Sequence, residues 1–279
     1  MRLFMIRDKY SATWVSYSSI TDYLKCPRSY FLKNIYKDPQ NRRKMQIVKP
    51  ALILGQVVHE VIEQLSILPS QERFKESLID RFNNEFAKFT GKRGGFSSEK
   101  EEKKYLDRGF TMMKRLNKNP GPIAKKIIKI RQELPNIWLD ENENIILCGK
   151  IDWLEYFPES DSVGILDFKT GKSDEDPESL QLRIYHLLAK NIQKRNVTQA
   201  SYWYLDRDDE PMKVKLPELV EAKHDILEIA KKIELARKLE HFICKKKDGC
   251  FACLPYEDIL LGKGEHVGTN EFGQDIYVI

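Results

Sequence analysis

Apolar positions along this chain recur with two periods, and the period marks the predicted helices and strands. Residues 51–65 are strongly apolar with charges only toward their end, which predicts a buried helix. Residues 70–118 repeat apolar side chains at helical spacing with a glycine-rich break at 91–95, which predicts a helical hairpin over a sheet. A long amphipathic helix is predicted from about Glu218 to Phe242.

Strands are predicted where β-branched and aromatic residues lie between turn residues. Residues 136–139 and 145–148 indicate an antiparallel pair, and residues 199–205 and about 212–216 indicate two further strands separated by a turn. The segment 125–134 fits a strand or a helix.

The most informative pattern is a hairpin predicted from residues 149–157 and 163–169, joined by a short loop. If that loop sets the register, Asp152 lies opposite Asp167. Alternation along the second strand places Asp167 and Lys169 on one face. Two carboxylates repel each other across a hairpin, so a counter-charge is needed, and Mg²⁺ or Mn²⁺ with oxygen ligands is the simplest one.

Each of these features also has a plainer interpretation. The same register sets Lys150 opposite Lys169, which is unfavourable unless a phosphate or a strand twist intervenes. An isolated D-x-K motif is short, and solvated strand aspartates are its favoured interpretation. A lone histidine such as His59, one helical turn after Gly55, is more often a core residue than a ligand, by about three to one.

A helix is predicted after the hairpin, starting where Asp176 precedes Pro177. Gln181 and Tyr185 are one turn apart on this helix. Core packing explains a tyrosine there, but a glutamine on the same face of the helix is less common in a protein core. The pair is therefore a candidate part of a polar site.

Composition narrows the class of protein. The chain has 279 residues, 41% of them hydrophobic and 32% charged, enough for one large domain or two small ones. No stretch approaches the ~20 apolar residues of a membrane span. The start of the chain, Met1 to Asp8, lacks the apolar core of a signal peptide, which predicts a cytoplasmic protein with no membrane partner. The net charge of +5 favours binding to polyanions only weakly.

Cysteine spacing indicates a metal rather than disulfides. Cys244, Cys250 and Cys253 form a C-x5-C-x2-C motif, and Cys26 precedes a proline more than two hundred residues upstream. A shared metal would close a very long loop and contribute about 4 kcal/mol or more. Four thiolates suit tetrahedral zinc and a 4Fe-4S cluster about equally. Unligated cysteines are the alternative, and Cys148 is predicted to be a buried strand residue.

Four short motifs, taken in order, resemble the RecB-like branch of the PD-(D/E)xK nucleases. They are Gly55-x3-His59, Gly149-x2-Asp152, Asp167-x-Lys169 and Gln181-x3-Tyr185. The N-terminal Tyr17-Ser18-Ser19 to Cys26-Pro27-Arg28, with the C-terminal cysteines, is similar to the iron–sulfur staple of AddB-type nucleases and CRISPR-associated RecB-like exonucleases. The resemblance spans roughly residues 16 to 255.

The resemblance implies an α/β fold with a restriction-endonuclease-like core, in which helices flank a mixed central β-sheet. It implies a single nuclease domain over residues 1–279, with a helical insertion at 70–120. A cysteine-ligated cluster at 244–253, completed by Cys26, would join the two ends of the chain. Residues 256–279 are expected to form a polar, loosely ordered tail.

The resemblance also implies a metal site for Mn²⁺ or Mg²⁺. Asp152 and Asp167 would bind the ion, with the backbone carbonyl of Phe168 and the His59 ring as further ligands. Glu133 lies where some relatives have another acidic residue, at a loosely fitting spacing. Asp167 stands where many relatives have glutamate, which leaves the number of ions open.

The remaining implied roles concern catalysis and the cysteines. Lys169 would orient or activate the attacking water, and Gln181 with Tyr185 would support DNA and that lysine. A carboxylate-held divalent ion beside an amine suits phosphodiester hydrolysis, because negative charge builds on the phosphoryl oxygens. The 4Fe-4S cluster, or structural Zn²⁺ as its alternative, would be held by Cys26, Cys244, Cys250 and Cys253.

The implied function is a metal-dependent DNA exonuclease acting on DNA ends or single strands, in recombination, repair, CRISPR adaptation or phage DNA metabolism. No Walker-type loop is found, so any ATP-driven unwinding would come from a helicase or from a CRISPR or recombination partner protein. Two alternatives remain, a structure-specific endonuclease and a non-catalytic DNA-end-binding subunit of a helicase–nuclease complex. The presence of both Asp167 and Lys169 favours an active enzyme.

Overall fold

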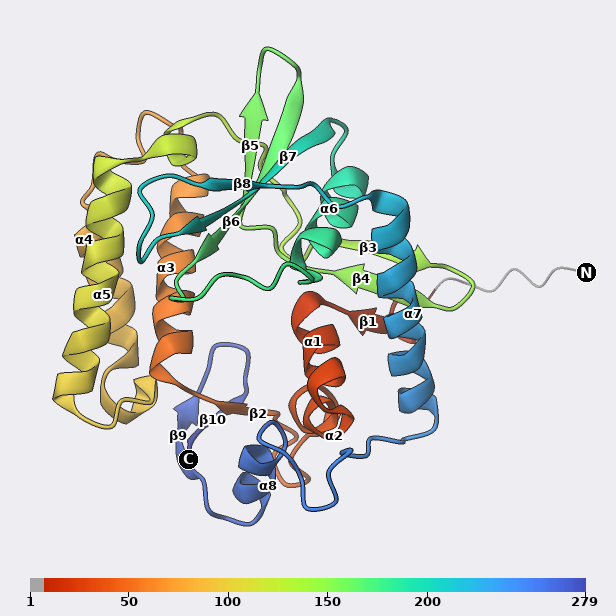
Figure 1. Cartoon of the computed structure of the whole chain (residues 1–279). Helices are drawn as coiled ribbons and strands as arrows, with labels where there is room; N and C mark the ends of the chain where they lie inside the picture. The colour runs from red at the N-terminus through yellow and green to blue at the C-terminus, as the bar shows by residue number, and fades with distance from the viewer. Residues whose placement is uncertain (1–7) are drawn as a thin grey trace, which may run out of the picture.

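The computed structural model describes residues 8–279, and its helices lie on both sides of a central sheet (Figure 1). The prediction made for the start of the chain concerns Met1 to Asp8, of which all but Asp8 lie outside the described residues. Within residues 8–279, no helix combines the length and the hydropathy that crossing a bilayer requires.

The central sheet has four strands in the order β5-β6-β7-β8. The hairpin β5–β6 is antiparallel, β7 runs parallel to β6, and β8 runs antiparallel to β7. The sheet is therefore mixed, as predicted. Its strands are β5 (Trp153–Phe157), β6 (Ser162–Lys169), β7 (Asn196–Tyr204) and β8 (Met212–Val214).

The predicted register of the hairpin is confirmed, because Tyr156 pairs with Val163 and every later pair follows in step. The ladder ends at Trp153 opposite Leu166, one residue short of the two aspartates. The expected contact between Lys150 and Lys169 does not form. Lys150 lies before β5 and pairs with Glu63 instead.

A second sheet has the order β1-β4-β3 and includes the predicted pair from residues 136–148. Its strands are β1 (Thr13–Val15), β3 (Asn136–Asp140) and β4 (Ile145–Cys148). The segment 125–134 is neither the predicted strand nor the predicted helix. It lies along the edge of β5, where the Ile128 N–H donates to the Leu154 carbonyl at 2.9 Å.

One helical layer packs on the sheet face formed by Trp153, Leu166, Phe168 and Trp203. It contains α3 and the predicted helical hairpin of α4 and α5, which lies against α3 (Figure 1). The opposite face packs against α6, with α7 behind it. The bounds are α1 (Tyr17–Lys25), α2 (Pro27–Tyr30), η1 (Phe31–Ile35), α3 (Pro50–Ser66), α4 (Leu78–Phe86), η2 (Ala87–Phe89), η3 (Gly91–Gly94), α5 (Glu99–Lys118), η4 (Gly121–Ala124), α6 (Gln181–Ile192) and α7 (Leu219–Lys238).

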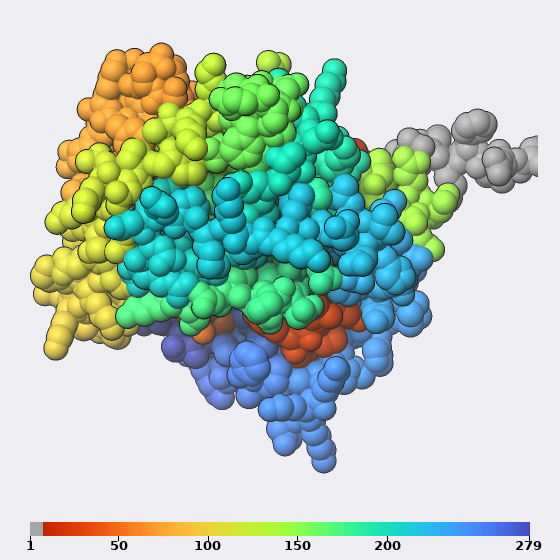
Figure 2. Space-filling view, turned by 45° about the horizontal axis from the view of Figure 1, so that its top comes forward, coloured from red at the N-terminus to blue at the C-terminus, as the bar shows by residue number. Residues whose placement is uncertain are grey.

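Strand alternation decides which helical layer each functional side chain faces. Leu166 and Phe168 point toward α3, so Asp167 and Lys169 point toward α6. The helix after β6 begins at Gln181 rather than at the predicted Asp176, which instead forms a turn by accepting from the Glu178 N–H. The segment around residues 170–180, green in Figure 2, lies against the red helix α1.

The predicted loosely ordered tail at 256–279 is wrong. These residues form the end of α8 (Leu254–Leu260) and a hairpin of β9 (Glu265–Thr269) and β10 (Asp275–Val278). Strand β10 pairs in parallel with β2 (Met45–Ile47). Burial of Ile276 at 5% exposure, together with hydrogen bonds from Asn41 and Arg43 to the Asp275 carboxylate, explains why the segment is ordered.

Gly109 is expected to tolerate no side chain, although glycine inside a helix normally costs stability. A Cβ on Gly109 would lie 1.9 Å from the Phe82 ring, so α5 approaches α4 through this glycine. Gly109→Ala should lower the free energy of unfolding by about 1–3 kcal/mol, measured by urea denaturation. Gly171→Ala, where a Cβ meets open space, is the control. A Gly109→Ala protein as stable as the wild type would contradict this packing.

Candidate functional site

Two aspartates meet where the central hairpin ends. Asp152 immediately precedes β5, and its Oδ2 accepts a hydrogen bond from the Phe168 backbone N–H at 3.1 Å. Burial opposes its ionisation, but the His59 charge and hydrogen bonds from His59, Phe168 and Asp167 lower the pKa of Asp152. Asp152 is therefore the ionised member of the pair.

Asp167 is the member of the pair whose ionisation is disfavoured. Its side chain is 1% exposed, and burial together with the neighbouring Asp152 charge raises the pKa of Asp167 to about 7. Its Oδ2 makes no hydrogen bond, although the Lys169 ammonium lies 3.0 Å away in an ion pair of poor hydrogen-bond geometry. A buried carboxylate oxygen beside a second carboxylate suits a hard divalent cation.

Gln181 connects the acid and the amine. As the first residue of α6, it accepts a hydrogen bond from the Lys169 amine, and its Nε2 donates to Asp167 Oδ1 at 2.7 Å. Nε2 also contacts the Tyr185 hydroxyl at 3.1 Å. Gln181 and Tyr185, predicted to be neighbours, therefore lie together beside Asp167. Burial raises the pKa of Tyr185 further above its usual range.

His59 reaches the site from α3. Its Nδ1 lies 3.3 Å from Asp152 Oδ1. Burial lowers its pKa, but the charge of Asp152 and the hydrogen bond to it prevail and raise the pKa of His59 to about 9. A Cβ on Gly55, one turn earlier on α3, would lie 3.3 Å from Thr170 Oγ1, so this glycine lets α3 approach the end of β6.

The Phe168 carbonyl points to the same edge of β6 as Asp152. The Lys169 carbonyl accepts from the Leu205 N–H on the β7 side. Because successive backbone groups point to opposite edges of a strand, the Phe168 carbonyl faces the β5 side, where the Phe168 N–H meets Asp152.

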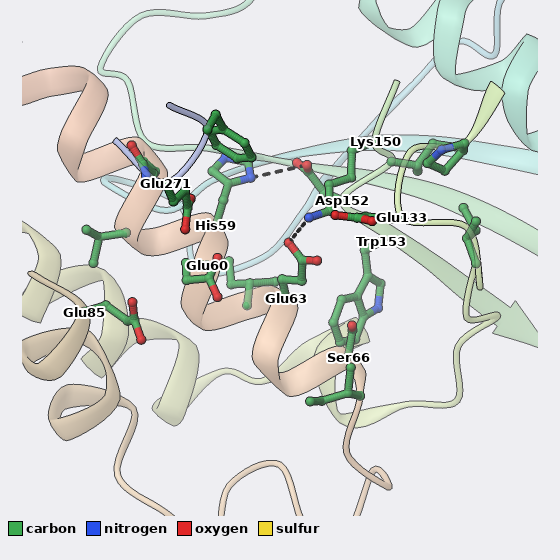
Figure 3. A pocket seen from close by; sticks show the side chains of 18 of the residues that line it. His59, Glu60, Glu63, Ser66, Glu85, Glu133, Lys150, Asp152, Trp153 and Glu271 are labelled. Atoms are coloured by element: carbon green, nitrogen blue, oxygen red, sulfur yellow. Dashed lines mark ion pairs between the residues drawn. The ribbon is translucent and has the colours of Figure 1, made fainter. Parts of the chain in front are cut away.

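A cavity of about 760 Å³ opens beside His59 and Asp152 (Figure 3). Figure 3 shows Lys150 over Glu63 on one wall and Glu133 near Asp152. Glu133 is exposed and lines this cavity, at the end of the irregular segment 125–134. It belongs to the surroundings of the aspartate pair rather than to its hydrogen-bond network.

The four predicted cysteine ligands come together from both ends of the chain. One sulfur from each lies within 4.8 Å of the others, and three of the four residues are buried. Among residues 8–279, the cysteines are the one group of potential metal-ligand side chains found to meet this closely, so the ligand atoms of His59, Asp152 and Asp167 are spaced more widely. Cys148 lies apart, buried in β4 as predicted, and burial raises its pKa to about 11.

The sulfur positions can be compared with those that the two metal alternatives require. A tetrahedral zinc with bonds of ~2.3 Å places its sulfurs ~3.8 Å apart. The sulfurs of Cys250 and Cys253 are 3.8 Å apart, and backbone N–H groups donate to the sulfurs of Cys244 and Cys253. In a 4Fe-4S cluster each thiolate binds a different iron, so the four sulfurs must lie further apart than around one zinc ion. Four cysteine sulfurs gathered this closely fit a bound metal.

Sequence reasoning missed Glu175 as a neighbour of the site. Its Oε2 lies 2.9 Å from the Lys169 amine, and its Oε1 accepts from the Tyr17 hydroxyl at 3.1 Å. Tyr17 entered the analysis only as part of the N-terminal motif. Glu175 follows Lys169 by six residues in a polar loop, where no periodicity marks it.

A mixed sheet that carries paired aspartates and a lysine at the end of a hairpin defines the class as a nuclease fold. The family model of the PD-(D/E)XK nuclease superfamily matches residues 14–258, and the chain belongs to this superfamily.

The fold is similar to the crystal structure of a candidate exonuclease from Eubacterium rectale, with a TM-score of 0.51 and 12% sequence identity. The match covers 87% of this chain and 88% of that chain. At this identity the likeness concerns the fold alone. No curated protein is similar enough to this chain to count as a match.

Proposed function

We propose that this protein is a divalent-metal-dependent DNA exonuclease of the RecB-like branch, acting on DNA ends or single strands in the cytoplasm. Recombination, repair, CRISPR adaptation and phage DNA metabolism are the processes that such an activity serves, with a helicase or a CRISPR or recombination protein as partner. The observation that carries the proposal is the pair Asp152 and Asp167 at the end of one hairpin, with the Lys169 amine 3.0 Å from Asp167.

The donors at this site suit Mg²⁺ or Mn²⁺. Asp152, Asp167 and the Phe168 carbonyl offer hard oxygen ligands, and His59 offers a nitrogen. The buried Oδ2 of Asp167 accepts no hydrogen bond and pairs only with the Lys169 ammonium at 3.0 Å, so it is free to bind an ion as well. When bound, a divalent ion supplies a Lewis acid for the phosphoryl oxygen and a water of lowered pKa.

Lys169 and Gln181 would stabilise the developing charge and hold the site in place. Burial lowers the pKa of Lys169, but the Asp167 charge and contacts with Glu175 outweigh it and raise that pKa, so the amine remains an ammonium. It therefore offers positive charge where negative charge develops, rather than a base for the attacking water. Gln181 holds Lys169 and Asp167 in one arrangement through its two polar atoms.

The cysteine centre is proposed as a structural metal site with two alternatives. The one-plus-three spacing resembles the iron–sulfur proteins and favours a 4Fe-4S cluster, whereas the compact sulfur group favours Zn²⁺. Metal analysis of anaerobically purified protein separates them, because a cluster gives four irons and a brown colour and zinc gives one colourless ion per chain.

The proposed activity is tested with end-labelled linear DNA and covalently closed circular DNA, each incubated with the anaerobically purified protein and Mn²⁺. Mononucleotides or short products from linear DNA, with intact circles, are expected. Cleaved double-stranded circles would indicate the endonuclease alternative. Binding of DNA ends without cleavage would indicate the non-catalytic subunit.

Metal binding is expected to strengthen as the pH rises. With its pKa near 9, His59 carries a proton at pH 7 that a metal must displace, so raising the pH removes the competitor. The Mg²⁺ dissociation constant, measured calorimetrically, should fall by up to about tenfold per pH unit between pH 7 and 9. His59→Ala should flatten this dependence. Identical Mg²⁺ titrations in wild type and variant would make His59 a core residue only.

A further inference from the structure

The loop between Lys169 and α6 turns one acidic side chain inward. From Gly171 to Glu178, every residue is exposed except Glu175. The Glu175 side chain is 19% exposed, whereas that of Glu178, three residues further on, is 84% exposed. An acid that gives up hydration in an otherwise solvated loop needs a partner inside.

Glu175 contacts residues on three different helices and strands. Its carboxylate lies 2.9 Å from the Lys169 amine on β6, and it accepts from the Tyr17 hydroxyl on α1. Its backbone N–H donates to the Tyr204 hydroxyl on β7 at 2.8 Å. Burial opposes ionisation, but hydrogen bonds from Lys169, Ser179 and Tyr17 lower the pKa of Glu175, so it carries a negative charge at neutral pH.

The loop itself is anchored on both sides of Glu175. Arg207, just beyond β7, pairs with Asp174 and donates to the Lys172 carbonyl at 3.3 Å. Ser179 contacts the Tyr17 hydroxyl at 3.2 Å. These contacts fix the backbone, so the Glu175 carboxylate approaches Lys169 from a defined direction.

We propose that Glu175 is a positioning residue, which holds the Lys169 ammonium against Asp167, and that Tyr17 fixes Glu175 from helix α1. A lysine has four rotatable bonds and a compact charge that one partner orients poorly. Two carboxylates, at 3.0 and 2.9 Å, together with Gln181, leave the amine little freedom. This role rests on the proposed nuclease function.

Tyr17 makes the arrangement depend on a distant part of the fold. It is the first residue of α1, and Cys26 caps the other end of that helix. Nine residues of helix span about 14 Å, so one rigid element connects the cysteine centre with the contact that orients the lysine. The order of α1 therefore contributes to the order of the active-site amine.

The test compares Glu175→Gln and Glu175→Asp with wild type in steady-state degradation of linear DNA at saturating Mn²⁺. Glu175→Gln should lower kcat by about ten- to a hundredfold with little change in KM, because the amine loses its orientation while DNA binding remains. Glu175→Asp should recover part of the loss. Glu178→Gln, in the same loop and paired only loosely with Arg183 at 3.4 Å, should match wild type.

A second readout is independent of nuclease activity. The shifts in thermal midpoint of Tyr17→Phe and Glu175→Ala should be non-additive in the double variant, because each single change removes the hydrogen bond from the Tyr17 hydroxyl to Glu175. Additive shifts, or an active wild type with unchanged kcat in Glu175→Gln, would overturn this inference alone. A wild type that degrades no DNA would overturn the proposed function and the role of Glu175 with it.

Discussion

Asp167→Asn and Lys169→Met proteins are expected to lose Mn²⁺-dependent degradation of linear DNA by about a thousandfold or more. Asp167 is the buried carboxylate with an unbonded oxygen, and Lys169 carries the positive charge beside it. Replacing either removes an electrostatic contribution that solvent cannot restore in a buried site. Initial rates on end-labelled DNA measure the loss.

The fold should survive both changes, with thermal midpoints close to that of the wild type. Each variant keeps a side chain of similar size, and the aromatic packing of Trp153, Phe168 and Trp203 lies on the other sheet face. Lys172→Met, an exposed lysine three residues beyond Lys169, is the matched control and should remain active. Wild-type rates in either active-site variant would refute the assigned chemistry.

Cys250→Ala protein is expected to lose its bound metal and to melt about 10 °C lower. Cys26 and Cys253 come from opposite ends of the chain, so the metal restricts the unfolded state over more than two hundred residues. Such a closure contributes about 4 kcal/mol in the chain-entropy model. Elemental analysis gives the metal content, and calorimetry gives the melting temperature.

Cys148→Ala is the matched control for this prediction. Cys148 is as buried as Cys250, at 8% exposure, but lies in β4 away from the sulfur group. It should keep the wild-type metal content and lose only the small stability of a buried thiol. Metal-free wild-type protein, or equal metal content in Cys250→Ala and wild type, would contradict a cysteine-bound metal.

The parts of the site that the sequence predicts are those set by short-range geometry. A two-residue period and a four-residue loop fix the register of the hairpin, so the approach of Asp152 and Asp167 just beyond its last pair follows from the chain alone. Helical spacing likewise predicts that Gln181 meets Tyr185. The family resemblance assigns His59 to the site, and cysteine spacing indicates the metal centre, but both depend on contacts between segments far apart in the chain.

Contacts between distant segments have no such signal. Strand β10 pairs with the three-residue strand β2, which lies more than two hundred positions earlier. Because this partner is so distant in sequence, the polar composition of residues 256–279 alone predicted a loosely ordered tail. Glu175 enters the lysine network because Tyr204 and Arg207 hold its loop, and neither lies near it in sequence. Lys150 avoids Lys169 because β5 starts later than its apolar pattern implied.

The central claim is that Asp152 and Asp167 bind one divalent ion together. Anomalous diffraction from crystals grown with Mn²⁺ and without Mg²⁺ tests it most directly. The account predicts an anomalous peak within about 2.3 Å of one oxygen from each carboxylate and of the Phe168 carbonyl oxygen. A manganese peak elsewhere, with Asp152 and Asp167 still paired only to His59 and Lys169, would contradict it.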